Sequence, residues 1–265
     1  MSKSNFIIKF LVNINKFINR LLEKNLNKLN INNLTSIVKS NKIFVTCVVL
    51  LILFFSYLSV PNIFNQKEVE KKLKAEFSEK FSFNINFSKK LHYNFFPRPH
   101  FVTEETAIFY NQFEISKIKN LKIYISPKNL FSIKGIKIND IILERGNFNL
   151  NSDNYNFFIN LLDKNFLNTG LRLINSNVFY RNIEREVLFI NKISEMRYYY
   201  DEKKLNNVLY SENELFNVPY SIEIFNDKNQ KKIYSNLNIN LFRLIIENEY
   251  NYENETKIGS ANLLF

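Results

Sequence analysis

Two histidines, one cysteine and a few acidic pairs are the side chains best suited to chemistry in this 265-residue chain. His92 and His100 lie in LHYNFFPRPHF, and a metal site there would need a third ligand, which Glu104 and Glu105 do not supply at a recognised spacing. Cys47 lies within an apolar run, where a thiolate is strongly disfavoured. The pattern therefore predicts no catalytic residue, no metal ion and no cofactor.

Motifs for phosphate binding and nucleophilic catalysis are missing from the sequence as well. The four glycines are too scattered for GxGxxG or GxxxxGK(S/T), and no GxSxG sequence occurs. The acidic pair Glu184/Glu186, like Glu104/Glu105, stands in a polar stretch of mixed charge, which is typical of a solvated surface. The sequence thus predicts a protein that is not an enzyme.

The most prominent element is an uncharged run of eighteen residues, IFVTCVVLLILFFSYLSV, from Ile43 to Val60. As a helix rising about 1.5 Å per residue it is roughly 27 Å long, close to the hydrocarbon thickness of a bilayer. A buried core helix is the alternative, but such a helix is usually shorter and has a polar side. Residues 43–60 are therefore predicted to be a transmembrane signal anchor.

The net charge of +11 is concentrated before this anchor. Residues 1–42 contain eight Lys or Arg and one acid, while the rest of the chain has a net charge of only +4. The positive-inside rule then predicts a single-pass protein with a cytoplasmic N-terminus and the bulk of the chain on the far side. Because no basic stripe follows the anchor, the charge pattern also excludes nucleic acid as a partner.

Residues 1–42 are predicted to form a basic amphipathic cytoplasmic tail, because apolar residues between Ile7 and Leu22 recur at a spacing of three to four. A chance pattern in a segment rich in Asn and Lys is the alternative. Residues 61–80 are predicted to be a charged helical linker, helical from Glu68 to Lys80.

Residues 81–265 are predicted to be an antiparallel β domain, because apolar and polar residues alternate in many short runs. A short helix is expected at 154–162, and the apolar end of the sequence suggests that the chain continues in a longer protein. Turns between strands are predicted at Asn139-Asp140, Arg145-Gly146-Asn147, Ser176-Asn177, Asn226-Asp227-Lys228-Asn229 and Gly259-Ser260.

The order of these parts resembles the amino-terminal part of the AsmA family. A loop with Pro97 and Pro99 precedes a unit of alternating apolar residues from Leu121 to Leu150, and a segment beginning at Asp153 follows. The chain departs from the family pattern at Asn154, where Gly is usual, and at Phe157, where Trp is usual. Within the unit, the matching positions are Ile123, Ile125, Leu130, Phe131, Ile136, Ile138, Ile141 and Leu143, followed by Asn156 and Phe157 and later by Asn217 to Tyr220.

The resemblance implies a periplasmic protein anchored in the inner membrane, with an elongated, curled antiparallel sheet that forms an open apolar groove. It also implies a role in outer-membrane biogenesis, with phospholipid acyl chains bound or conducted in that groove. An anchored scaffold that binds other envelope proteins is the alternative, with the apolar face closed into an ordinary core. The residues expected to line the groove are Phe83, Ile85, Phe87, Leu121, Ile123, Ile125, Ile136, Ile138, Ile141, Leu143, Phe148 and Leu150.

Overall fold

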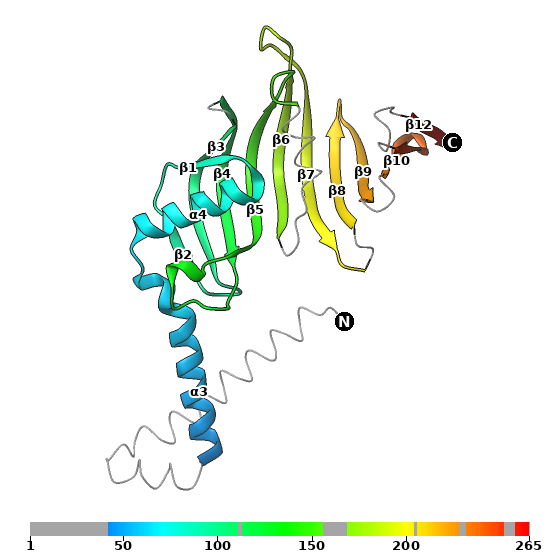
Figure 1. Ribbon diagram of the computed structural model, residues 1–265. Coiled ribbons are helices and arrows are strands. Elements are labelled where there is room, and N and C mark those ends of the chain that lie inside the picture. The colour runs from blue at the N-terminus through cyan, green and yellow to red at the C-terminus, as the bar shows by residue number, and fades with distance from the viewer. Residues whose placement is uncertain are drawn as a thin grey trace. The chain divides into compact units, whose positions relative to one another are not determined.

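The computed structural model describes residues 42–110, 113–155, 169–203, 206–227, 232–251 and 258–264 (Figure 1). The chain divides into two compact units, Met1–Ser56 and Tyr57–Phe265. The tail predicted for residues 1–42 lies outside the described residues, apart from Lys42.

The described residues form two α-helices, three short 3-10 helices and twelve strands. The α-helices are α3 (Lys42–Ser59) and α4 (Gln66–Phe81), and the 3-10 helices are η1 (Val60–Ile63), η2 (Ile133–Gly135) and η3 (Asn240–Phe242). The strands are β1 (Asn84–Phe87), β2 (His92–Asn94), β3 (His100–Tyr110), β4 (Phe113–Ile125), β5 (Ile138–Leu150), β6 (Gly170–Arg181), β7 (Val187–Asp201), β8 (Asn206–Leu215), β9 (Val218–Asp227), β10 (Lys232–Ile239), β11 (Leu244–Asn251) and β12 (Ile258–Leu264).

The described strands build one curled open sheet, in which β1 and then β3 to β12 follow one another in chain order (Figure 1). β2 pairs with β3 outside this path. The predicted mainly β architecture is thereby confirmed. One detail was not predicted: β5 and β6 are parallel, whereas all other neighbours are antiparallel. Residues 151–169 therefore connect opposite ends of two neighbouring strands, and most of the helix expected at 154–162 lies outside the described residues.

One helix in the described part of the chain is long and apolar enough to cross a membrane. The candidate span runs from Val45 to Ile63 and is only 11% buried. It contains all but the first two residues of the predicted 43–60 anchor and continues through η1. The finding agrees with the sequence prediction of a single hydrophobic anchor near the N-terminus.

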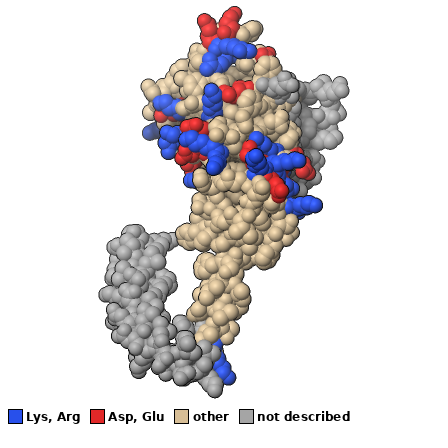
Figure 2. All heavy atoms as spheres, turned by 90° about the vertical axis from the view of Figure 1, so that its left-hand side faces the viewer, with Lys and Arg blue, Asp and Glu red and all other residues tan. Residues whose placement is uncertain are grey.

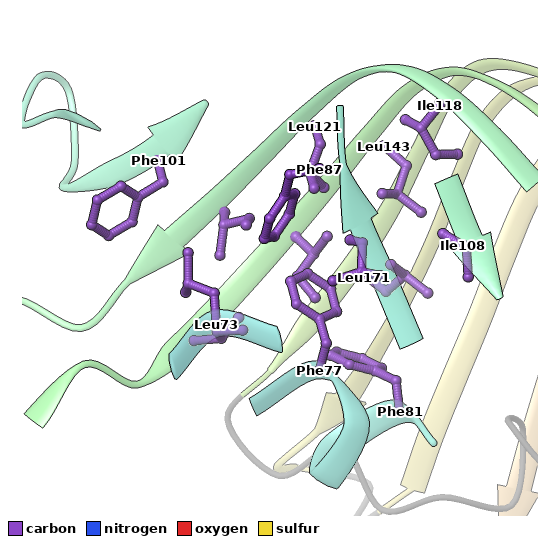
Figure 3. Close-up of a cluster of buried hydrophobic side chains, with 14 of the residues drawn as sticks. Leu73, Phe77, Phe81, Phe87, Phe101, Ile108, Ile118, Leu121, Leu143 and Leu171 are labelled. Atoms are coloured by element: carbon purple, nitrogen blue, oxygen red, sulfur yellow. The ribbon is translucent and has the colours of Figure 1, made fainter. Parts of the chain in front are cut away.

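α4 is part of the core of the β unit rather than a linker. The side chain of Asn65 caps its first turn by accepting a hydrogen bond from the backbone N–H of Lys67 at 3.0 Å. Its apolar residues recur on one side, and Leu73, Phe77 and Phe81 are fully buried against the sheet (Figure 3). The segment predicted as a charged linker thus closes the first half of the sheet with its apolar side, and most of its charged residues stay on the exposed side, apart from the buried Glu76.

An irregular line crosses the sheet near the middle of its strands. Glu105, Arg145 and Asn175 all adopt positive φ angles and lie at matching positions of β3, β5 and β6. The alternation of side chains shifts by one residue at this line, so that Ile118 before it and Leu121 after it both face the same core. We call this feature the kink line.

The kink line explains why two of the predicted turns are absent. Residues 145–147 lie inside β5 and residues 176–177 lie inside β6. Asn139-Asp140 and Gly259-Ser260 also fall within strands, β5 and β12. The same residue types that favour turns also favour bulges, because both require a positive φ or a local bend.

Replacing Phe77 with Ala should lower the free energy of unfolding by about 3–5 kcal/mol, because a fully buried ring would leave a cavity between α4 and the sheet. Denaturant unfolding of the whole chain in detergent measures the change. Glu79→Ala, at an exposed position of the same helix, should stay within about 0.5 kcal/mol of the parent. Equal effects of the two substitutions would contradict the packing described for α4.

Gly146→Ala should destabilise the protein by about 1–3 kcal/mol, because the new Cβ would lie 2.7 Å from Cδ1 of Ile118 and 2.8 Å from the ring of Phe148. Arg145→Gly is the matched comparison, since it removes a side chain at a φ of 56° and should cause no loss of stability. Thermal unfolding, monitored by circular dichroism, gives the unfolding midpoint of each variant for comparison with the parent. A stable Gly146→Ala variant would show that the kink line is loosely packed.

Candidate functional site

Two rows of side chains, apolar apart from Ser211 in the first row, run across the sheet on the face that packs against α4, which we call the inner face. Members of a row are paired in register on neighbouring strands, so their side chains lie side by side. The first row contains Leu121, Leu143, Leu173, Met196, Ser211, Ile222, Leu237 and Ile246. The second row contains Ile123, Ile141, Leu171, Tyr198, Leu209 and Ile224.

The first half of the inner face is a closed core. α4 and the phenylalanine cluster around Phe81 and Phe83, whose rings stack at 5.5 Å, cover it (Figure 3). Of the residues expected to line a groove, Leu150 alone is only partly buried. The buried ones are Phe83, Ile85, Phe87, Leu121, Ile123, Ile125, Ile136, Ile138, Ile141, Leu143 and Phe148.

These eleven side chains form the centre of a packed core and offer no open surface to a ligand in this structure. The sequence prediction identified their apolar alternation correctly, but it did not identify α4 as the element that covers them. An acyl chain at this place would have to displace α4, whose buried leucine and phenylalanines contribute several kcal/mol to folding.

The second half of the inner face is open. From Met196 onward the apolar side chains of both rows are half-buried, apart from Tyr198, which is buried. Figure 1 shows α4 in front of the first strands, while no described α-helix lies over β8, β9 or β10. The half-buried residues are Met196, Leu209, Ile222, Ile224, Leu237 and Ile246. We call this set the open apolar surface.

The open apolar surface was not among the sites expected from sequence. The alternation in β9 and β10 is visible in the sequence around Ile222, Ile224 and Leu237. Its exposure depends on which strands α4 covers, and this is a tertiary relation that alternation alone does not reveal. The signal that would have pointed to it is the length of the β segment, which far exceeds what one sixteen-residue helix can cover.

Buried amide groups flank the two rows on the inner face. On one side, the Asn191 side chain donates to Oδ1 of Asn213 at 3.3 Å and accepts from the hydroxyl of Tyr220 at 3.0 Å. Burial raises the pKa of the Tyr220 hydroxyl above its usual value, so it remains a donor. On the other side, Asn207 and Asn226 are paired and buried. The apolar strip is therefore bounded by polar groups along both of its edges.

The opposite, outer face of the same strands carries ion pairs. Nζ of Lys122 lies 2.6 Å from Oε1 of Glu144, and Glu195 binds both Arg172 and Arg197. Hydrogen bonds from Arg197 and Arg172 lower the pKa of Glu195 to about 2. The two faces thus differ in chemistry along the row of Leu121 and Leu173, where the inner face is apolar and the outer face carries the ion pairs.

Two concave depressions in the described surface lie off the two rows. One of about 870 Å³ is lined by residues near the kink line, among them Lys119, Arg145 and Asn175. Another of about 640 Å³ lies at the ends of β5, β6 and β7 and is lined by Asp140, Tyr200 and other residues. Neither of these two depressions is lined by a residue of the open apolar surface.

The histidines and the cysteine lie apart from the open apolar surface. His100 is buried with Nδ1 2.7 Å from the carbonyl oxygen of Arg98, and its ring stacks on Tyr124 at 5.0 Å. His92 is exposed in β2, and Cys47 is exposed on α3. Among the described residues, no three His, Cys, Asp or Glu side chains are grouped so that they could hold a metal ion.

No protein-family model matches this chain, and the search of curated proteins finds no match either. The resemblance to the AsmA family therefore rests on the order of sequence features and stays a prediction.

Replacing Glu195 with Gln should make the protein less sensitive to acid. Because the pKa of this carboxyl is lowered in the folded state, its contribution to stability is present at neutral pH and is lost as the pH falls from about 5 toward 2. The difference in unfolding midpoint between pH 7 and pH 3 should be smaller in the variant than in the parent. Glu247→Gln, which removes an exposed carboxylate without an ion pair among the described residues, should retain the parental difference.

Proposed function

We propose that the protein is anchored in a membrane by its N-terminal apolar helix and holds phospholipid acyl chains on the open apolar surface. The observation that carries this proposal is the continuation of two apolar rows from a closed core onto strands where their side chains remain half-exposed. A soluble monomer rarely leaves so extended an apolar strip in water unless something binds there.

The dimensions of the strip suit an acyl chain. From β7 to β11 the first row crosses four strand spacings, or about 19 Å at about 4.8 Å each. Each CH₂ group that leaves water for an apolar surface contributes about 0.8 kcal/mol, so a chain lying along the row is held without any directional contact. Such binding requires no catalytic residue, metal ion or cofactor.

The polar borders of the strip limit where an acyl chain can lie. The amides of Asn191 and Asn213 beside the rows are buried and hydrogen-bonded to each other, so they mark an edge of the strip and the headgroup would stay in water. The proposal places the β unit on the side of the membrane away from the cytoplasm, because eight bases precede the span and the later charges are mixed. That this membrane is the inner membrane and this side the periplasm follows from the AsmA resemblance alone. A role in outer-membrane biogenesis follows from the AsmA resemblance alone.

A scaffold that binds other envelope proteins is the second candidate. It is favoured by large apolar side chains exposed in the β6–β7 hairpin and the β8–β9 turn: Ile183 is 87% exposed, Leu188 62% and Phe216 75%. Exposed apolar groups of this kind mark surfaces for protein contacts. The closed core under α4 is compatible with either function.

Leu237→Lys should reduce the amount of phospholipid that copurifies with the full chain. The substitution removes apolar contacts worth about 1.5 kcal/mol and places an ammonium group in the strip, which corresponds to roughly tenfold weaker binding. Asn236→Lys is the matched control, because residue 236 precedes Leu237 in β10 and faces the other side of the sheet. Mass spectrometry of the extracted lipid gives the molar ratio of phospholipid to protein for each variant.

The lipid proposal fails if both variants retain parental amounts of phospholipid while unfolding like the parent. In that case a scaffold role is the better explanation, and substitution of Phe216 should then reduce capture of a protein partner. A loss of lipid in Leu237→Lys alone supports the acyl-chain strip.

A further inference from the structure

The end of the candidate membrane span is held by loops of the β unit. The hydroxyl of Tyr57 donates to the carbonyl oxygen of Pro127 at 2.6 Å and accepts from the backbone N–H of Leu130 at 3.1 Å. The hydroxyl of Tyr93 donates to the carbonyl oxygen of Leu58 at 2.6 Å, and burial raises the pKa of Tyr93 to about 12. Residues 57–63 belong to the span as well as to the β unit, so these loops lie at the depth where the span ends.

Two loops at this end of the sheet expose large apolar side chains. Phe96, between β2 and β3, is 80% exposed, and Phe131, between β4 and β5, is 71% exposed. Ile63, at the end of the span, is 83% exposed. The loops are neighbours, because the N–H of Ile125 at the end of β4 donates to the carbonyl oxygen of Pro99 just before β3. The ring of Phe131 lies 4.9 Å from the ring of Tyr57.

The charged residues around these loops are distributed as expected for a segment at a membrane surface. Residues 126–137 contain three exposed lysines, Lys128, Lys134 and Lys137, and no acidic residue. On the face shown in Figure 2, charged side chains form a belt over the β unit, and an uncharged surface follows below it. Aromatic side chains with lysines at their border are typical of the interface between a bilayer and water.

The length of the helix gives an independent argument. From Ile43 to Tyr57 it rises about 21 Å, whereas the hydrocarbon layer is about 30 Å thick. If Lys42 lies at one surface of the membrane, Tyr57 lies inside the other leaflet rather than beyond it. The loops that bind Tyr57 then reach the bilayer as well.

We propose that the loops 95–99 and 126–137 form a membrane-inserting rim, in which Phe96, Phe131 and Ile63 enter the interface of the leaflet where the span ends and the lysines contact its anionic headgroups. The inference rests on the proposed membrane anchor. It deepens the proposed function, because it brings one end of the β unit into direct contact with the lipid that the unit would bind.

The absence of tryptophan from the chain permits a direct test with single-tryptophan variants. Phe96→Trp and Phe131→Trp report the rim, Leu53→Trp reports the span, and Phe216→Trp reports a distant exposed turn. Each full-length variant is reconstituted into vesicles of phosphatidylglycerol and phosphatidylcholine that carry a quencher either near the headgroup or near the end of the acyl chain.

If the rim enters the membrane interface, F96W and F131W lose most of their fluorescence to the quencher near the headgroup. L53W is quenched by the one near the end of the acyl chain, and F216W is quenched by neither. If L53W is quenched while F96W and F131W are not, the rim is refuted and the anchor stands. If L53W is not quenched by either, the anchor itself is refuted. Two rim positions, both exposed, keep the test valid if one variant folds poorly.

Discussion

The structure depends on one constraint, which is that a single amphipathic helix covers only part of a long apolar sheet face. α4 buries Leu73, Phe77 and Phe81 against the first strands and so closes a core there. The registered rows continue from Leu173 to Met196 and then to β8 through β11, where their apolar side chains are half-buried. The closed core and the proposed lipid-binding surface are therefore two parts of the same sheet face. They differ in that α4 covers the first and not the second.

The kink line keeps that face continuous. Without a shift in the alternation at Glu105, Arg145 and Asn175, the apolar residues on one side of the line would point to the outer face. The ion pairs of Glu195 then hold the outer face of β6 and β7 as a polar surface. If the rim at Phe96 and Phe131 enters the bilayer, one end of this two-faced sheet lies where phospholipid is available.

Much of this architecture could be predicted from the sequence, because alternation and an uncharged run are local signals. The anchor around residues 43–60, the helix near Leu73 and Phe77 and the β-rich remainder were all predicted. The parallel pairing of β5 with β6 and the packing of α4 on the sheet could not be predicted, because they depend on contacts between distant segments. For the same reason the expected groove residues, such as Ile123 and Leu143, proved to be core, while Met196, Leu209 and Ile246 were not anticipated.

The most direct test of the central claim is a photocrosslinking scan with a benzophenone side chain along β9 and β10 of the full chain in membranes. The account predicts that phospholipid is captured from Ile222, Ile224 and Leu237 and not from Glu223 or Asn236, so that capture alternates with the two faces of the strands. Equal capture from both faces, or capture from neither, would contradict it.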